Sequence, residues 1–237
     1  MKFARKSADE WLDEDHGSAR EVASALRSLR FVNRWFGGDR VHHLLLREAV
    51  RAMPYSPGPR QEVHVLEVAA GRATALEAAS RLLAADGITV RATLLDRQAS
   101  HLPEHWPRNL PSPIPLQGDA LAIPLPARSV DIVSCCLFLH HLEPAEVLVL
   151  LGEALRVARV AVVINDLERT PAHFVLAKLF SLVDPSRLSR HDGPVSVRRA
   201  YTAGELGAML AQVDGARVRV RRHFLYRLAG IIWTSQE

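Results

Sequence analysis

Three acidic residues stand at positions that could hold a ligand with amine and hydroxyl groups: Glu67, Asp96 and Asp119. Glu67 lies within an apolar run, Asp96 ends the run LLD, and Asp119 follows Gly118 in a loop. A carboxylate accepts two hydrogen bonds from a vicinal diol, which suits Asp96 to a ribose. Asp119 would meet the ring of a bound adenosine, and Glu67 would lie beneath the ligand near an ammonium group. The acids therefore predict a nucleotide-like ligand.

A turn of small residues follows the first of these runs. Residues 63–73 read VHVLEVAAGRA, which predicts a strand, a tight turn at Gly71 and a helix from Thr74. Such a turn lets the backbone approach a ligand, and the helix end offers free N–H donors. Ala69 and Ala73 stand where a full fingerprint would carry glycine. Alanine fits there if φ stays negative, although it narrows the approach of the backbone.

Two adjacent histidines follow the fourth apolar run and could take a proton from an acceptor. Imidazole titrates near neutrality, so His140 and His141 are candidate general bases. The alternative is that they hold local structure or a bound water. Asp166 ends the next predicted strand, and it would either orient a substrate or cap a turn.

Substrate contacts are expected from residues outside the predicted strands. His173 and Tyr201 flank the variable 171–200 segment and, with Trp35, are candidates to line the pocket. Apolar side chains that could form a ceiling over the acceptor, or could simply be core, are Trp35, Phe36, Phe174, Phe180 and Leu182. An apolar ceiling favours a hydrophobic acceptor.

Neither a metal site nor a disulfide is expected. His191 and Asp192 are adjacent, but two potential ligands without a third make a metal site improbable. The chain has two cysteines, Cys135 and Cys136, and neighbours on a strand point to opposite faces. Buried free thiols in a reducing compartment are the better interpretation.

Strand and helix patterns alternate after a helical N-terminal part. Strands are predicted at residues 63–69, 88–95, 130–137 and 159–165, with two more in the tail joined at 223–226. Helices are predicted at 21–36, 41–53, 74–85, 144–157, 171–183 and 202–210. A loop or a broken helix is predicted at 103–115, which is rich in proline, and a loop is predicted at 186–196, which is polar. This alternation predicts a mostly parallel sheet with helices on both faces and an antiparallel last strand.

The 237 residues carry a formal charge of +4, with arginines concentrated in two segments, 198–199 and 217–222. A basic face of this kind could meet nucleic acid, or it could be a set of solvated arginines. No apolar run is long enough to span a membrane, and the N-terminus has no apolar signal-peptide core. A cytoplasmic protein without membrane insertion is therefore expected.

Several motifs taken together resemble the class I S-adenosylmethionine-dependent methyltransferases. They read VLEVAAGRA, TLLDRQ, GDALAIPLPARSVDIVSCCLFLHHL and VVINDLER. The chain is most similar to the small-molecule branch, which includes quinone-biosynthesis and natural-product methyltransferases, over roughly residues 60–235. The resemblance implies a Rossmann-like α/β fold with a seven-stranded sheet. It also implies a helical cap at residues 1–58, a cofactor domain at 59–237 and a substrate-lid insertion at 171–200.

By this resemblance the turn at Gly71 cradles the methionine part of S-adenosylmethionine, and Asp96 binds the ribose. Asp119 and the Ala120 N–H would recognise the adenine edge. The residues expected at the cofactor are Glu67, Ala69, Gly71, Arg72, Asp96, Arg97, Gly118, Asp119, Ala120, Cys136 and Leu137.

The acceptor is expected to be a small, aromatic or hydrophobic molecule such as a phenol, polyketide or quinone, methylated at oxygen or carbon in secondary metabolism. RNA methylation is one alternative, although nucleic acid is the less favoured partner. A non-catalytic binding subunit that keeps the fold is another. The chain is expected to be a monomer or a homodimer.

Overall fold

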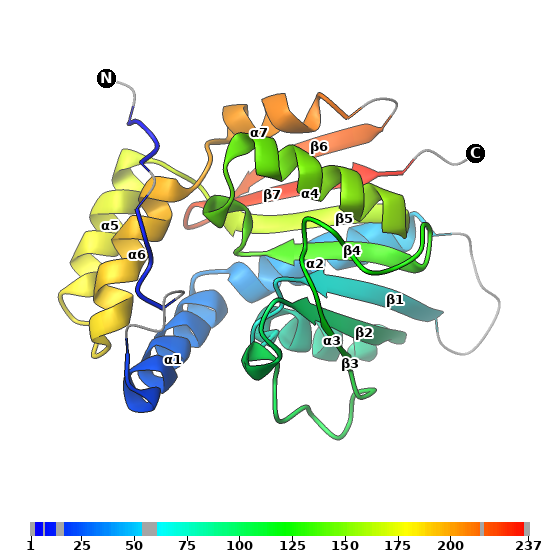
Figure 1. The fold of residues 1–237 in the computed structure, drawn as a ribbon, viewed down its shortest axis with the longest axis horizontal. Coiled ribbons are helices and arrows are strands. Elements are labelled where there is room, and N and C mark those ends of the chain that lie inside the picture. Colours follow the sequence, from blue (N-terminus) through cyan, green and yellow to red (C-terminus); the bar gives the residue numbers. More distant parts are fainter. Residues whose placement is uncertain (1–2, 7, 13–16, 54–60, 214–215, 235–237) are drawn as a thin grey trace.

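A computed structural model of the chain describes residues 3–6, 8–12, 17–53, 61–213 and 216–234. In this part, seven strands form one sheet in the order β3-β2-β1-β4-β5-β7-β6 (Figure 1). The strands are β1 (Gln61–Val68), β2 (Ile88–Asp96), β3 (Ile114–Gln117), β4 (Val130–Cys136), β5 (Ala158–Leu167), β6 (Arg217–His223) and β7 (Arg227–Trp233). β7 runs antiparallel to β5 and β6, and the other described pairs are parallel. This arrangement confirms the predicted sheet.

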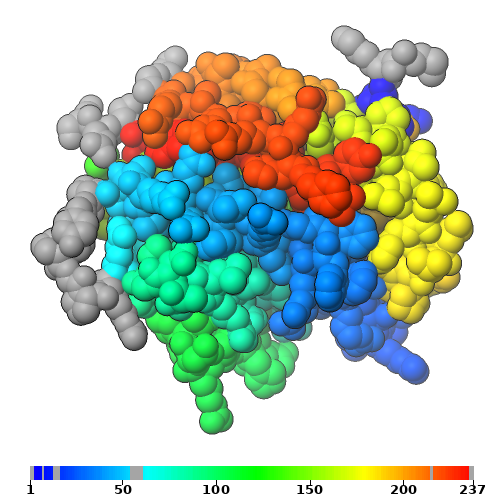
Figure 2. Space-filling model, turned by 180° about the vertical axis from the view of Figure 1, so that it is seen from behind, coloured from blue at the N-terminus to red at the C-terminus, as the bar shows by residue number. Residues whose placement is uncertain are grey.

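Helices cover both faces of the sheet, as predicted. They are α1 (Ala19–Trp35), α2 (Gly38–Arg51), α3 (Thr74–Ala85), α4 (Pro144–Val157), α5 (Pro171–Ser181), α6 (Arg187–Arg199) and α7 (Ala203–Leu210), with short 3-10 turns η1 (Ala99–His101) and η2 (Leu139–His141). α2 and α3 pack on one face, which Figure 2 shows from outside, and α4 and α7 pack on the other. The predicted boundary between residues 58 and 59 lies outside the described residues.

The core consists of two layers because side chains of each buried strand alternate between the faces. Val63 and Val65 of β1 join the layer under α2 and α3, whereas Leu66 and Val68 join the layer under α4. All four are fully buried. Removing each such side chain from water contributes roughly 1.5–3 kcal/mol to folding, so β1 fixes the centre of the sheet.

The remaining helices lie beyond one end of the sheet. β1 pairs with both β2 and β4, so the order of the strands reverses there. In open sheets of this kind, ligands bind outside the carboxyl ends of the strands at such a reversal. α1, α5 and α6 stand at that end (Figure 1). The fold thus directs attention to the loops that follow β1, β2, β4 and β5.

A short strand that was not predicted begins at the end of one predicted irregular stretch. Residues 103–115 were expected to be irregular because of their prolines, but Ile114–Gln117 forms β3. β3 is the outermost strand and pairs only with β2 among the described strands, so Pro115 is tolerated at the edge.

A second predicted loop is a helix. The polar stretch 186–196 lies largely within α6, although Gly193 and Pro194 are typical helix breakers. Ser186 caps the helix by accepting a hydrogen bond from the Ser189 N–H at 3.2 Å. α6 packs against α5 and α1, and this tertiary packing outweighs the weak local propensity.

Candidate active site at the carboxyl end of the sheet

The turn after β1 adopts a left-handed backbone at three positions. φ is 49° at Ala69, 47° at Gly71 and 49° at Ala73. The condition under which alanine would fit there easily, a negative φ, is therefore not met at either alanine. The turn is held from both sides, because the Ala70 N–H donates to the Leu95 carbonyl at 2.9 Å and the Ala73 N–H donates to the Ala70 carbonyl at 2.7 Å. The wider fold thus imposes a conformation that glycine adopts more easily.

Asp96, at the end of β2, contacts this turn directly. Its Oδ2 accepts a hydrogen bond from the Gly71 N–H at 2.9 Å, and its Oδ1 accepts one from the Gln98 N–H at 3.0 Å. The carboxylate is largely buried, with 8% of the residue exposed. A Cβ added to Gly71 would meet no heavy atom within 4 Å, so the turn borders open space. The structure brings these two predicted residues together at a backbone surface that a ligand can approach.

Glu67 lies beneath the turn in a buried polar cluster. Desolvation by burial raises the pKa of Glu67 to about 7, partly opposed by a hydrogen bond from Ser134. Glu67 Oε2 has no hydrogen-bond partner among the described residues, and His42 Nε2 lies 3.6 Å from it. Burial lowers the pKa of His42 to about 4. A buried carboxylate oxygen without a donor is the kind of group that an ammonium of a ligand would satisfy.

Asp119 lies on the loop after β3 and is paired with Arg97. Arg97 Nη2 is 2.7 Å from Asp119 Oδ2, and the Leu121 N–H donates to Asp119 Oδ1 at 2.8 Å. The hydrogen bond from Arg97 is the main cause that lowers the pKa of Asp119. Space at Gly118 is tight, since an added Cβ would be 3.0 Å from a side-chain carbon of Leu95. The Gly118 N–H donates to the Asp96 carbonyl at 2.9 Å, which connects the loop that carries Asp119 to the end of β2.

The remaining predicted cofactor residues surround the same edge of the sheet. Arg72 Nη1 donates to the Leu102 carbonyl at 3.2 Å. Leu137, directly after β4, has φ 55°. Both cysteines are free; Cys135 is buried as expected, whereas Cys136 is partly exposed. Ala120 is also buried.

The three predicted catalytic residues lie close together at the ends of β4 and β5. His140 Nδ1 is 2.7 Å from Asp166 Oδ1, and the His140 N–H donates to Asp166 Oδ2 at 3.2 Å. Desolvation by burial raises the pKa of Asp166, but the charge of His140, its hydrogen bond and smaller contributions together lower it by more, so the net shift is downward. The rings of His140 and His141 are 4.2 Å apart. Asp166 therefore positions the His140 ring.

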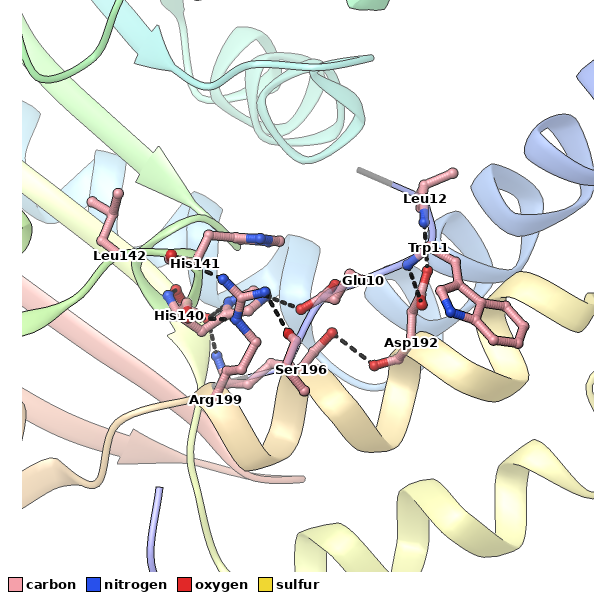
Figure 3. A network of polar contacts seen from close by, with 12 residues as sticks. Glu10, Trp11, Leu12, His140, His141, Leu142, Asp192, Ser196 and Arg199 are labelled. Atoms are coloured by element: carbon pink, nitrogen blue, oxygen red, sulfur yellow. Dashed lines mark hydrogen bonds and ion pairs between the residues drawn. The ribbon is translucent and has the colours of Figure 1, made fainter. Parts of the chain in front are cut away.

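The N-terminal segment covers this group; the resemblance implied a cap at residues 1–58 but did not indicate which of its residues reach the histidines. Glu10 Oε1 lies 3.8 Å from His140 Nε2 (Figure 3). The Asp192 carboxylate accepts hydrogen bonds from the N–H groups of Trp11 and Leu12 at 2.9 and 3.0 Å. Trp11 also stacks on His191 at 3.9 Å. His191 and Asp192 thus anchor the segment to α6.

The three predicted substrate residues occupy different environments. Tyr201 is buried, and its hydroxyl donates to the Leu142 carbonyl at 2.6 Å. His173 stacks on Tyr226 at 5.0 Å, with its Nδ1 2.8 Å from the Glu168 carbonyl. Trp35, at the end of α1, is 67% exposed. The structure does not bring these three together.

An aromatic cluster joins α1 to α5 instead. Phe31 stacks on Phe180 at 6.3 Å, and Phe36 meets Phe180 edge-on at 6.0 Å. Phe31 remains half-exposed, as do Val175 and Leu179 on α5. This apolar surface lies at the end of the molecule where the strands terminate (Figure 1).

Comparisons with known proteins agree with this geometry. Residues 66–163 match a family model described as a methyltransferase domain. No match was found among the curated proteins. A SAM-dependent methyltransferase from Aquifex aeolicus is 21% identical, with a TM-score of 0.52, covering 82% of this chain and 89% of that chain. The plantazolicin methyltransferase BpumL in complex with SAH is 13% identical, with a TM-score of 0.66, covering 94% of each chain. These likenesses show that the fold is that of SAM-dependent methyltransferases.

Proposed function

We propose that this chain, whose residues 66–163 match a methyltransferase-domain model, transfers a methyl group from S-adenosylmethionine to a small, hydrophobic acceptor. The observation that carries the proposal is the contact between Asp96 and the turn at Gly71, above the buried Glu67. These residues offer, in one place, acceptors for a diol, a backbone surface for a narrow ligand and a carboxylate for an ammonium group.

Two features of the described residues fit S-adenosylmethionine: a carboxylate oxygen without a hydrogen-bond partner and an open space beside the turn. Glu67 Oε2 has no hydrogen-bond partner there, and the space at Gly71 is open. In this proposal Glu67 faces the ammonium group, Asp96 takes the ribose, and Asp119 with Ala120 lies at the adenine. When bound, S-adenosylmethionine supplies a methyl group on a sulfonium, which is already a good leaving group. The protein must then align an acceptor and remove a proton from its O–H or acidic C–H group.

That second task is assigned to His140, His141 and Asp166. Asp166 holds His140 through Nδ1, which fixes the direction of the other ring nitrogen. Both histidines follow β4 closely, so they lie next to the proposed cofactor residues Cys136 and Leu137 in the chain. An acceptor with an O–H or an acidic C–H would meet these groups from the side of α1, α5 and α6.

The surface between α1 and α5 favours a hydrophobic acceptor. Phe31, Phe36 and Phe180 form an apolar wall, which favours an aromatic or aliphatic body over a polar one. The structural neighbour BpumL is described as a plantazolicin methyltransferase in complex with a pentazolic desmethylPZN analogue and SAH. We therefore place this chain in natural-product methylation, with the N-terminal helices and residues 171–200 as the substrate lid.

A methylation assay tests the proposal. The protein is incubated with S-adenosylmethionine and a panel of phenols, polyketides and quinones, and formation of S-adenosylhomocysteine is measured. We expect acceptor-dependent product formation, and we expect at least about a tenfold loss when Asp96 is replaced by alanine. Cofactor binding without turnover across the panel would instead support a non-catalytic subunit.

A further inference from the structure

Three potential metal ligands meet where the N-terminal segment crosses the end of β4. They are Glu10, His140 and His141, and one ligand atom from each lies within 4.8 Å of the others. Glu10 and His140 are buried, and His141 is partly buried. Figure 3 shows the Glu10 carboxylate directed toward the two histidines from the segment above α6. Residues far apart in the sequence thus form one compact donor set.

The donor set has the support that metal-binding histidines require. A histidine that binds a metal through one ring nitrogen usually donates its other N–H to a carboxylate or carbonyl, which fixes the tautomer and the ring. In this structure His140 Nδ1 is 2.7 Å from Asp166 Oδ1, so its Nε2 is left to face Glu10 at 3.8 Å. Asp166 itself is held, because the Leu167 N–H donates to its Oδ1 at 2.6 Å.

We propose that Glu10, His140 and His141 bind a divalent transition-metal cation, with zinc as the probe. Two imidazoles and a carboxylate suit zinc and iron rather than magnesium or calcium, which prefer oxygen ligands alone. Three protein ligands also leave at least one coordination position open, as in catalytic zinc sites. This site could not be predicted from the sequence, because the third ligand comes from the N-terminal segment.

The cation would be positioned by contacts already present in the protein. Asp192 holds the backbone of Trp11 and Leu12, directly after Glu10. Arg5 Nη2 donates to the Leu142 carbonyl at 2.8 Å, which fixes the segment to the loop after η2. The site is therefore formed between two parts of the chain that are fastened together independently of a metal.

The open position gives the cation a role in methylation, and this step alone rests on the proposed function. A metal-bound hydroxyl loses its proton more easily than a free one. In that case His140 and His141 act as ligands and not as bases. An acceptor hydroxyl bound to the cation would lose its proton to solvent, and its oxygen would take the methyl group as S-adenosylhomocysteine leaves. Metal binding itself does not depend on that activity.

Calorimetric titration of the chelator-treated full chain with zinc tests the proposal. We expect one equivalent to bind, and cobalt to give a visible absorption band in its place. Glu10→Gln and His141→Gln should each weaken zinc binding by at least about tenfold, and Asp166→Asn by about 10- to 100-fold. His105→Gln changes an exposed histidine outside the site and should leave zinc affinity unchanged.

The outcomes separate this proposal from the proposed function when S-adenosylhomocysteine is titrated into the same samples. Absence of zinc binding, or equal affinity in the His141→Gln and wild-type proteins with intact circular dichroism, overturns the metal site. If that happens while S-adenosylhomocysteine still binds, the methyltransferase proposal stands. Zinc binding without S-adenosylhomocysteine binding would support the metal site and overturn the methyltransferase proposal.

Discussion

Burial controls the charge of Glu67, the residue beneath the proposed cofactor site. Burial raises its pKa from 4.5 to about 7, so the folded protein holds a neutral carboxyl more readily than the unfolded chain does. The stability due to this group is fully present below about pH 4.5 and is lost as pH rises toward 7. His42 acts in the opposite direction. Burial lowers its pKa from 6.5 to about 4, so the stability that neutral His42 contributes to the protein is lost as pH falls from about 6.5 to about 4.

Glu67→Gln separates the two effects. The variant removes the ionisation of Glu67 and keeps that of His42, which cancels in the comparison. Relative to wild type, we expect its free energy of unfolding to rise by about 2 kcal/mol between about pH 5 and about pH 8, since one pKa unit corresponds to about 1.4 kcal/mol. Urea unfolding at the two pH values measures this. A difference that stays constant with pH would show that Glu67 ionises normally.

At the residue scale, the positions of Asp96 and of the turn at Gly71 could be predicted from the sequence, because an acid and a tight turn each follow an apolar run. The structure brings the two into contact, and their role at a cofactor stays a prediction. Glu10 could not be found, because its position beside His140 depends on how the N-terminal segment crosses α6. Backbone angles were equally hidden, as the left-handed Ala69 shows.

In the turn between β1 and α3, alanines occupy backbone positions whose left-handed conformation favours glycine. A left-handed conformation costs a residue with a Cβ roughly 1–2 kcal/mol, whereas glycine adopts it freely. Replacing alanine by glycine also makes the unfolded chain more flexible, which offsets roughly 0.4–1 kcal/mol of the gain. Ala69 is only partly buried, so little packing is lost at that position.

Ala69→Gly should therefore stabilise the protein by about 0.5 kcal/mol. Ala84→Gly is the matched control, because Ala84 is exposed within α3 and has no such strain. It should destabilise by roughly 0.5–1 kcal/mol. Chemical denaturation measures both changes. Loss of stability in both variants would mean that the turn carries no strain at Ala69.

Other elements show why pattern alone succeeds or fails. The strands of the sheet centre were predicted because they are continuous apolar runs, buried on both faces. β3 was missed because it is short, exposed and contains Pro115. α6 was missed because its helical state depends on packing against α1 and α5, and local sequence favours a loop at Gly193 and Pro194.

At the scale of the whole molecule, three of the four arginines of β6 have partners within the chain, among them Arg222, which pairs with Glu168. Arg217 and Arg219 lie over the Trp233 ring at 3.9 and 4.9 Å, and Arg219 Nη1 is 2.5 Å from Glu48 Oε1. These contacts favour the interpretation of a structural basic face, and RNA methylation stays the alternative. Among the described residues, no helix is both long enough and apolar enough to cross a bilayer.

The whole fold converges on one end of the sheet, where the acids, the turn and the N-terminal segment meet. Calorimetric titration of the chain with S-adenosylhomocysteine tests the central claim of a cofactor site there. We predict one equivalent bound with a dissociation constant near micromolar. Asp96→Ala should weaken it by at least about tenfold, and the exposed control Asp86→Ala should leave it unchanged. Absence of binding at concentrations well above micromolar, or equal binding by the Asp96→Ala variant, would contradict the claim.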